Sequence, residues 1–347
     1  MADTDEPYLI LSFDGGGIRG LVTALLLQRI NSQFPDFLGR VNLFAGTSTG
    51  SFIALGLGSG AQSGITPDTL VNLYATQGQN IFQPYSEIGD TFDYVEYYND
   101  GLKAALLTAL PTAAQTLSEL AAGNPQQRVL VTTFQLFAPE TNTWLPLVLH
   151  NLPNSDSAAN TTILDAAMSS SAAPTYFPPY QHPYYGYCVD GGVVANNPST
   201  LALAMAMDPT LADVPIGNIR LLSLGTGVTL DSIPNDVVES VGPMNYGVKN
   251  WMWPEASAPT PALPLMTLMF DGVSSIDTYQ CQQLLGARFQ RGNVPLPASY
   301  ALDDWQDIDT LTGYVNTYLG TGGGSPAQNW TDVINWISKN FPDAGAS

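Results

Sequence analysis

Two apolar segments near the start of the chain each lead into a glycine-rich turn, and this pattern constrains the fold more than any other feature. Residues 8–13 (YLILSF) precede the turn 14–20 (DGGGIRG), and residues 41–45 (VNLFA) precede the turn 46–50 (GTSTG). A helix-like segment follows each turn. Short apolar runs are typical of buried strands, and glycines allow the close backbone approach that a tight strand-to-helix junction needs. This part of the chain is therefore predicted to consist of strand–turn–helix units.

The alternation of strands and helices continues to about residue 230. The predicted strands span residues 8–13, 41–45, 128–137, 144–150, 184–189 and 219–224. The predicted helices span residues 18–33, 49–57, 161–171 and 198–207, and a further helix opens at Thr66-Pro67-Asp68. The third and fourth strands could form a hairpin. The pattern predicts an α/β fold with a mostly parallel sheet covered on both faces. The glycine turns and the strand end near Asp190 would then converge at the carboxyl edge of the sheet, where such folds bind ligands.

The remaining segments are less regular. Residues 80–125 combine aromatic side chains with an Ala/Leu-rich helix at about 102–121, which predicts a helical insertion or a lid. The later segments are predicted as a proline-rich loop, a helix, a flexible linker and a last helix, at residues 228–262, 263–287, 318–326 and 327–340. We expect residues 1–347 to form a single domain, with residues 231–347 as a helical extension packed on the core.

The charge balance excludes several classes of partner. Thirty acidic residues face ten basic ones, which gives a net charge of −20. A nucleic-acid partner is excluded because phosphate neutralisation needs clustered Lys and Arg, and contact with a membrane or micelle would have to be apolar and transient.

The chain has no apolar run long enough for a transmembrane helix and no basic, apolar leader, so we expect a cytoplasmic protein, with a secreted mature form left open. Cys188 and Cys281 lack metal-ligand spacing, and a disulfide framework is not expected; Cys188 is expected to be a small buried residue. We expect no metal and no cofactor.

The turn Gly46-Thr47-Ser48-Thr49-Gly50 has the spacing of a nucleophile elbow. In such a turn the serine sits on a sharp strand-to-helix junction, and its hydroxyl stands at the start of the following helix. The apolar strand before the turn and the helical segment after it supply this context. Ser48 is thus a candidate nucleophile, although a serine that only caps a helix would give the same pattern.

The turn Gly15-Gly16-Gly17-Ile18-Arg19-Gly20 allows two interpretations. It matches the G-x-G-x-x-G pattern of dinucleotide-binding folds, but these expect an acidic residue at the end of the second strand, where this chain has Gly46-Thr47-Ser48. The alternative is an oxyanion hole, in which the amides of Gly15, Gly16 and Gly17 converge on one oxygen. Arg19 would either brace the turn or contact a phosphate.

A nucleophilic serine needs a base, and the chain offers few candidates. Its only histidines are His150 and His182, and no acidic residue is singled out as a partner for either. Asp190 ends a strand-like run and precedes Gly191-Gly192, so it could face the serine directly as a dyad partner. Exclusion of water would raise its pKa and improve it as a base near neutral pH. An aspartate that merely stabilises a glycine turn remains an equal alternative.

Five motifs occur in an order that resembles the patatin-like phospholipases. They are DGGGIRG at 14–20, GTSTG at 46–50, SSAAPTYFPP at 170–179, DGG at 190–192 with NNP at 196–198, and SLGTG at 223–227. The resemblance covers about residues 7–230 and implies a three-layer α/β/α sandwich. It also implies that Ser48 is the nucleophile, that Asp190 completes a Ser–Asp dyad, and that Gly15, Gly16 and Gly17 form the oxyanion hole.

The implied function is that of a serine acyl hydrolase, a phospholipase A or lipid acyl hydrolase that cleaves fatty acyl esters through an acyl-enzyme. The alternative is a patatin-like storage or lipid-binding protein with residual esterase activity. Residues 251–253 and 263–270 could contact apolar substrate or could simply cover the core. Residues 80–125 and those after 230 carry no motif of the family, and Gly192 stands where many members have Ala.

Overall fold

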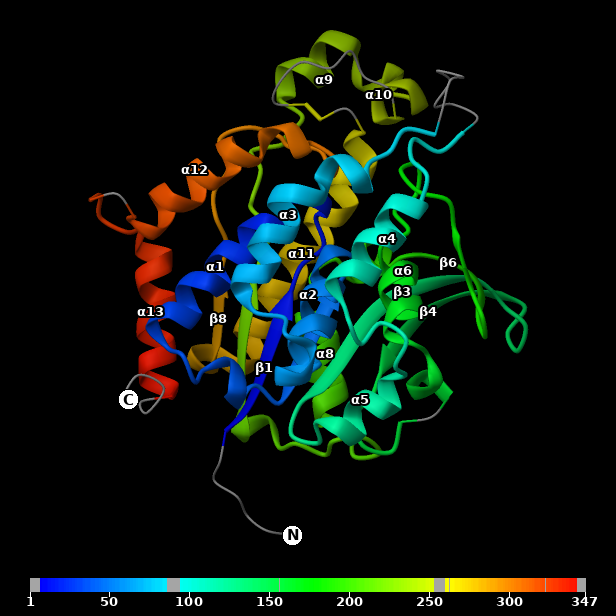
Figure 1. The fold of residues 1–347 in the computed structure, drawn as a ribbon. Helices are drawn as coiled ribbons and strands as arrows, with labels where there is room; N and C mark the ends of the chain where they lie inside the picture. The colour runs from blue at the N-terminus through cyan, green and yellow to red at the C-terminus, as the bar shows by residue number, and fades with distance from the viewer. Residues whose placement is uncertain are drawn as a thin grey trace.

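The computed structural model describes residues 7–85, 94–155, 157–252, 260–261, 263–321 and 323–341, and its centre is one eight-stranded sheet (Figure 1). The strands are β1 (Tyr8–Phe13), β2 (Leu43–Thr47), β3 (Arg128–Ala138), β4 (Thr143–His150), β5 (Tyr180–His182), β6 (Gly186–Asp190), β7 (Ile219–Leu224) and β8 (Phe289–Gly292). Their order is β5-β6-β3-β2-β1-β7-β8, and β4 pairs with β3 beside this path.

The sheet is mixed, with a parallel part and an antiparallel part. The pairs β3–β2, β2–β1, β1–β7 and β7–β8 are parallel. The pairs β3–β4, β3–β6 and β5–β6 are antiparallel. The expected hairpin of β3 and β4 is therefore confirmed, whereas β6, expected among the parallel strands, runs the other way.

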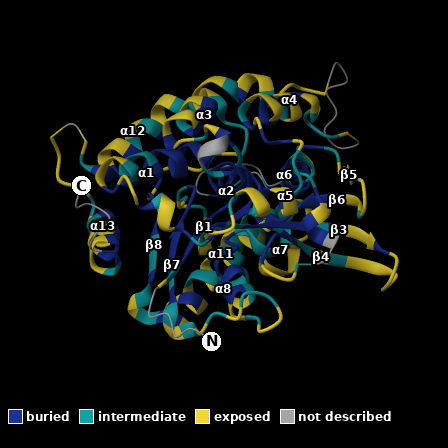
Figure 2. Cartoon of the chain, turned by 60° about the horizontal axis from the view of Figure 1, so that its bottom comes forward, coloured by how far each residue is buried: buried dark blue, intermediate teal, exposed yellow. Residues whose placement is uncertain are grey.

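Helices cover both faces of the sheet, as expected for an α/β sandwich (Figure 2). The main helices are α1 (Gly20–Gln33), α2 (Thr49–Gly58), α3 (Pro67–Ile81), α4 (Asp100–Ala109), α5 (Leu117–Gly123), α6 (Ile163–Ser170), α8 (Ser199–Met207), α11 (Pro264–Leu285), α12 (Ile308–Leu319) and α13 (Gln328–Asn340). Shorter ones are α7 (Gly192–Ala195), α9 (Asn235–Val241) and α10 (Val248–Met252). The helix predicted from Thr66-Pro67-Asp68 is α3, and the Thr66 hydroxyl caps it by accepting the Thr69 N–H at 3.2 Å.

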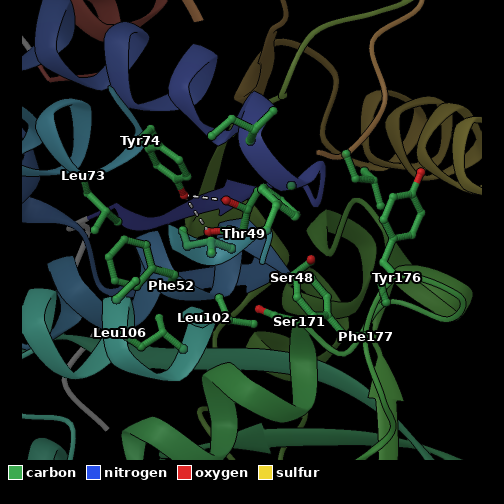
Figure 3. A pocket seen from close by; sticks show the side chains of 17 residues that line it. Ser48, Thr49, Phe52, Leu73, Tyr74, Leu102, Leu106, Ser171, Tyr176 and Phe177 are labelled. Carbon is green, nitrogen blue, oxygen red and sulfur yellow. Dashed lines mark hydrogen bonds between the residues drawn. The ribbon is translucent and has the colours of Figure 1, made fainter. Parts of the chain in front are cut away.

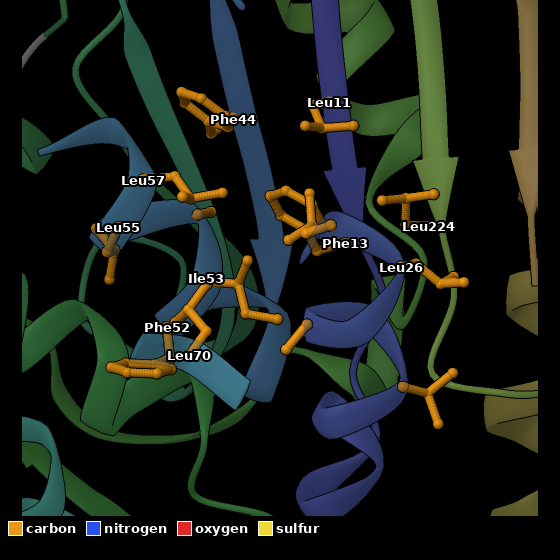
Figure 4. Packing of buried hydrophobic residues seen from close by; sticks show 14 of the residues in the cluster. Leu11, Phe13, Leu26, Phe44, Phe52, Ile53, Leu55, Leu57, Leu70 and Leu224 are labelled. Atoms are coloured by element: carbon orange, nitrogen blue, oxygen red, sulfur yellow. The ribbon is translucent and has the colours of Figure 1, made fainter. Parts of the chain in front are cut away.

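Alternation along the buried strands divides the core into two layers. Leu9, Leu11 and Phe13 of β1 pack against α1, α2 and α3, and Figure 4 shows Leu11 and Phe13 in this cluster. Ile10 packs on the opposite face with α8 and α11. Successive side chains of a strand point to opposite faces, so a strand that is apolar throughout needs a helical layer on each side. The three-layer arrangement follows directly from this pattern.

Several segments differ from the sequence-based prediction. The helix expected at 102–121 is two helices, α4 and α5, because Pro111 lacks an N–H and disfavours helical backbone in the residue before it. The region 228–262, predicted as loops, contains α9 and α10. The short strands β5 and β8 and the helix α12 were not predicted, and the first two residues of the expected linker 318–326 belong to α12.

The C-terminal region contributes a strand as well as helices. Strand β8 pairs with β7 at the edge of the sheet, and Trp330, Val333 and Ile337 of α13 are buried in the same core cluster as α1. Residues 231–347 are thus more than the helical extension that was expected. Across the described residues, no helix combines the length and apolarity that a membrane crossing requires.

Candidate active site

Ser48 occupies a sharp turn between β2 and α2. Its backbone has φ 53° and ψ −123°, an unfavourable combination for a residue with a side chain. A Cβ at Gly46 would overlap the backbone of Gly50, and a Cβ at Gly50 would overlap the Phe13 carbonyl. Gly46 is therefore required by the tightness of the turn itself, and Gly50 by the close approach of the turn to β1. Strain held by such packing is typical of a nucleophile elbow.

Asp190 reaches Ser48 because β2 and β6 share one edge of β3. Thr47, the last residue of β2, pairs with Thr132, and Asp190, the last residue of β6, pairs with the next residue, Thr133. Strand β4 occupies the opposite edge of β3 at the same positions. Since β2 is parallel and β6 antiparallel to β3, the two strands run toward each other and end at the same point. The serine turn and the aspartate turn meet there.

Residues at the end of α6 and just after it hydrogen-bond to both turns. The Ser170 hydroxyl accepts the Ser48 N–H at 2.8 Å, and the Ala172 carbonyl accepts the Asp190 N–H at 2.9 Å. The Thr47 hydroxyl donates to the Ala195 carbonyl at 2.6 Å, just beyond Asp190. Segment 170–172, the start of the SSAAPTYFPP motif, thus fixes the two side chains relative to each other.

Asp190 is buried and has an altered pKa. The side chain is 4% exposed, and burial raises its pKa from the ordinary value of 3.8 to about 6. A hydrogen bond with the Ser48 side chain and one from the Gly192 N–H, at 2.7 Å, oppose the rise by stabilising the ionised carboxylate. The group can therefore exchange a proton near neutral pH.

The glycine turn places two free amides beside this pair. The Gly15 N–H donates to the Asn196 carbonyl at 2.9 Å, so it is not free to bind an oxyanion as the sequence suggested. For Gly16 and Gly17, no described residue accepts the backbone N–H. A Cβ on Gly15 would lie 3.2 Å from the Ser48 Cβ, which shows how close the two turns are. The available donors are therefore Gly16 and Gly17.

Residues from the C-terminal region hold the glycine turn in place. The Leu302 carbonyl accepts the Ile18 N–H at 2.8 Å and packs against Gly17, whose φ of 56° and tight surroundings exclude a side chain. Arg291 of β8 forms a two-pronged ion pair with Asp14, with 2.8 Å between its Nη1 and Oδ1, and also donates to the Ser223 hydroxyl at 2.6 Å. Arg291 and Leu302 lie in no motif, so nothing in the sequence singled them out.

The two histidines lie elsewhere. Nδ1 of His182 accepts the backbone N–H groups of Tyr184 and Tyr185, at 3.1 and 3.3 Å, and burial lowers the pKa of its ring. Nδ1 of His150 accepts the Leu152 N–H at 3.3 Å. Neither residue lines the cavity onto which Ser48 opens. These contacts suit structural histidines.

An apolar cavity opens at Ser48 (Figure 3). It encloses about 660 Å³ of empty space, mouth included, and its walls come from α2, α3, α4 and the segment 171–177. The apolar lining side chains are Ile18, Phe52, Leu73, Ile81, Phe82, Leu102, Ala105, Leu106, Ala173, Phe177 and Leu302. The hydroxyl groups of Tyr74 and Thr49 in the wall hydrogen-bond to each other, with 2.5 Å between their oxygens. The cavity therefore offers room for a hydrocarbon chain and few polar partners.

Arg19 lies outside this cavity, in a neighbouring cleft. Its Nε is buried without a hydrogen-bond partner, and burial lowers the pKa of the guanidinium, while Asp271 and Asp231 raise it. Leu263, Met266 and Phe270 line the same cleft, whereas Leu265 is exposed, so the predicted apolar segment 263–270 lies partly at a cleft and partly on the surface. Trp251 and Met252 are half-buried in α10, and Trp253 is outside the described residues.

In the described part of the chain, no three Asp, Glu, His or Cys side chains are grouped so that they could hold a metal ion. Cys188 and Cys281 are free and buried; the burial of Cys188 was expected.

Comparisons with known proteins agree with this geometry. The family model of the patatin-like phospholipases matches residues 11–203, a segment that contains both turns and Asp190. The chain belongs to the patatin-like phospholipase family.

Its relatives include Protein teg of Priestia megaterium, which is 33% identical over 89% of this chain and 94% of its own length. The putative sporulation hydrolase CotR of Bacillus subtilis is 30% identical over 84% of this chain and 88% of its own. The cGAMP-activated phospholipase of Vibrio cholerae is 31% identical over 62% of this chain and 63% of its own.

Proposed function

We propose that this patatin-like protein is a serine acyl hydrolase that cleaves fatty acyl esters, as a phospholipase A or lipid acyl hydrolase. The observation that carries the proposal is the meeting of Ser48 and Asp190 at one edge of β3, beside two unpaired glycine amides and an apolar cavity. A nucleophile, a base, an oxyanion site and a chain-sized cavity are the parts that ester hydrolysis requires.

In the first half of the reaction, the Asp190 carboxylate accepts the proton of the Ser48 hydroxyl while the Ser48 Oγ attacks the ester carbonyl carbon. The carbonyl oxygen gains the negative charge and is held by the Gly16 and Gly17 amides. When this intermediate collapses, the bond to the alcohol breaks and Asp190 returns its proton to the leaving oxygen. The acyl group remains on Ser48.

In the second half, water attacks the acyl carbon and Asp190 accepts a proton from it. The intermediate then releases the fatty acid, and the proton returns to Ser48. The strained turn fixes Ser48 throughout, and burial keeps Asp190 basic enough for both steps.

The acyl chain would occupy the cavity lined by α2, α3 and α4, since its walls are almost wholly apolar. Access to lipid would involve transient apolar contact with a membrane or micelle surface, because a chain of net charge −20 has little attraction to anionic headgroups. Arg19 belongs to the glycine turn but lines the neighbouring cleft, where it could contact a phosphate.

The test is the hydrolysis of short- and long-chain p-nitrophenyl esters by the wild type and by Ser48→Ala. We expect kcat to fall by a factor on the order of 10⁴ or more in the variant, as for other enzymes that lose a nucleophile. Ser32→Ala, a change at an exposed serine of α1, is the matched control and should retain activity. Undiminished turnover by Ser48→Ala would refute the proposal.

A further inference from the structure

A second cleft lies next to the proposed acyl cavity, and the two share walls. It encloses about 710 Å³ of empty space, mouth included. Tyr176 and Leu302 line both it and the acyl cavity. In Figure 3 the Tyr176 ring points away from the acyl cavity, toward helix α11, which forms much of the wall of the second cleft.

Both catalytic turns border this second cleft. Arg19 follows Gly17 by two residues and lines it directly. From the other side, Phe270 of α11 packs on the aspartate turn, since a Cβ on Gly192 would lie 3.3 Å from the Phe270 ring. If an ester is held at Ser48 with its acyl chain in the first cavity, its alcohol portion can therefore extend into this second cleft.

The charges in the cleft are of both signs and are not paired with each other. Asp271 and Asp231 are the carboxylates that act most strongly on Arg19, yet neither is within 4.0 Å of the guanidinium, and the Arg19 Nε has no partner. The Thr229 hydroxyl holds the Asp231 carboxylate by donating to it at 2.6 Å. Arg19 is half-buried, and its buried Nε lacks an acceptor, so the gap between these charges favours a ligand that supplies one.

We propose that the second cleft binds the headgroup of a zwitterionic phospholipid, with the phosphate at Arg19 and the ammonium group at Asp231 and Asp271. The rings of Tyr176, Tyr300 and Phe270 line the same cleft and suit a cation that carries alkyl groups. An anionic headgroup would bring negative charge to two carboxylates, and an uncharged acylglycerol would leave Arg19 without a partner. The proposal rests on the proposed acyl hydrolase function and names its substrate class.

The experiment compares phosphatidylcholine with phosphatidylglycerol of identical acyl chains, each at a fixed mole fraction in neutral detergent micelles. The variants are Asp271→Asn and Asp231→Asn. Glu239→Gln, at an exposed residue of α9 outside the cleft, is the matched control because it removes the same single charge. The readout is the ratio of kcat/KM on the two lipids, with p-nitrophenyl butyrate as a substrate without a headgroup and thermal unfolding as a check on folding.

We expect the wild type to prefer phosphatidylcholine and each Asp→Asn change to lower the preference about fivefold, which is the contribution of one partly buried ion pair or cation–π contact. Glu239→Gln should keep the wild-type ratio. A ratio that is the same in all four proteins would overturn the proposal, as would equal losses on p-nitrophenyl butyrate and phosphatidylcholine. Ser48→Ala separates the two ideas. If Ser48→Ala retains turnover, the hydrolase function is refuted. If Ser48→Ala is inactive but the Asp→Asn variants keep the wild-type ratio of kcat/KM on the two lipids, only the headgroup site is refuted.

Discussion

At the scale of single residues, the protonation state of Asp190 decides when the proposed dyad can work. Burial favours the neutral carboxyl and raises the pKa to about 6, while hydrogen bonds from Ser48 and Gly192 limit the rise. A general base must be ionised to accept a proton. Activity should therefore be lost as pH falls below about 6 and reach a plateau above it.

This expectation is tested by measuring kcat/KM for p-nitrophenyl butyrate from pH 4.5 to 8. We predict about a tenfold loss per pH unit on the acidic side of the midpoint, because one proton blocks the base. Asp190→Asn should lose this dependence together with most of its activity. His150→Asn and His182→Asn should keep the wild-type profile. Loss of the acidic limb in either histidine variant would contradict the assignment of Asp190 as the base.

Gly17 tests the oxyanion turn at the same scale, because a well-matched control exists. The turn at Gly17 has φ 56° and packs against the Leu302 carbonyl, whereas Gly286 has φ 54° and open space around it. We predict that Gly17→Ala lowers kcat on the order of 10²-fold by displacing an amide donor. Gly286→Ala also strains a backbone of positive φ, at a cost on the order of 1–3 kcal/mol, but should retain kcat. Similar kcat values for both variants would argue against an oxyanion role for this turn.

At the residue scale, the sequence predicted the geometry of a turn where the motif was local. Gly46, Ser48 and Gly50 could be recognised as a strained turn because its geometry is set by neighbours in the chain. Gly15 was predicted as an oxyanion donor in error, since its amide is taken by Asn196, far along the sequence. The contact of Arg291 with Asp14 spans most of the chain and leaves no local signal.

At the scale of elements, the site depends on β8 as much as on the motifs. Arg291 and Asp14 are both largely buried, with side-chain exposures of 15% and 5%, and the pair fixes the residue that precedes the glycine turn. Removing one partner of a buried ion pair leaves an uncompensated charge, whereas removing both partners does not.

We therefore predict that Arg291→Met lowers the free energy of unfolding by about 3–5 kcal/mol. The double variant Arg291→Met with Asp14→Asn should recover part of that loss. Denaturant unfolding of the wild type, both single variants and the double variant forms a thermodynamic cycle that measures the coupling. Strictly additive losses would show that the pair does not act as a unit.

Helix α4 belongs to the segment that was expected to be an insertion or a lid, and it supplies Leu102, Ala105 and Leu106 to the proposed acyl cavity. We predict that Ala105→Phe fills part of the cavity and lowers kcat/KM on p-nitrophenyl palmitate at least tenfold more than on the butyrate. Ala104→Phe, one residue earlier and exposed, is the control and should keep the wild-type ratio. A palmitate-to-butyrate ratio that Ala105→Phe leaves unchanged would place the acyl chain elsewhere.

Long elements with clear periodicity were predictable from sequence, and short ones were not. The apolar run of β1 matches its prediction residue for residue. Strand β8 has only four residues, too few for an alternating apolar pattern to distinguish it from a loop. The direction of β6 could not be predicted locally either. It depends on pairing with β3 from Thr133 onward, where β2 has ended and leaves that edge of β3 available.

At the scale of the whole molecule, the family match does not cover all of the residues that build the candidate site. The match ends at residue 203, yet Leu302 and Arg291 position the glycine turn, and α11 borders the aspartate turn. The resemblance identified the family and the sandwich fold, and it pointed to the turns proposed as catalytic. The supporting contacts come from the region in which sequence analysis found no motif, so they could be found only from the structure.

The central claim is that Ser48 is the nucleophile and that Asp190 activates it. The most direct test is reaction with an alkyl fluorophosphonate, followed by intact-mass and peptide mass spectrometry. We predict one adduct per chain, located on Ser48, absent from Ser48→Ala and formed far more slowly in Asp190→Asn. An adduct on another residue, or equal labelling rates in the wild type and Asp190→Asn, would contradict the account.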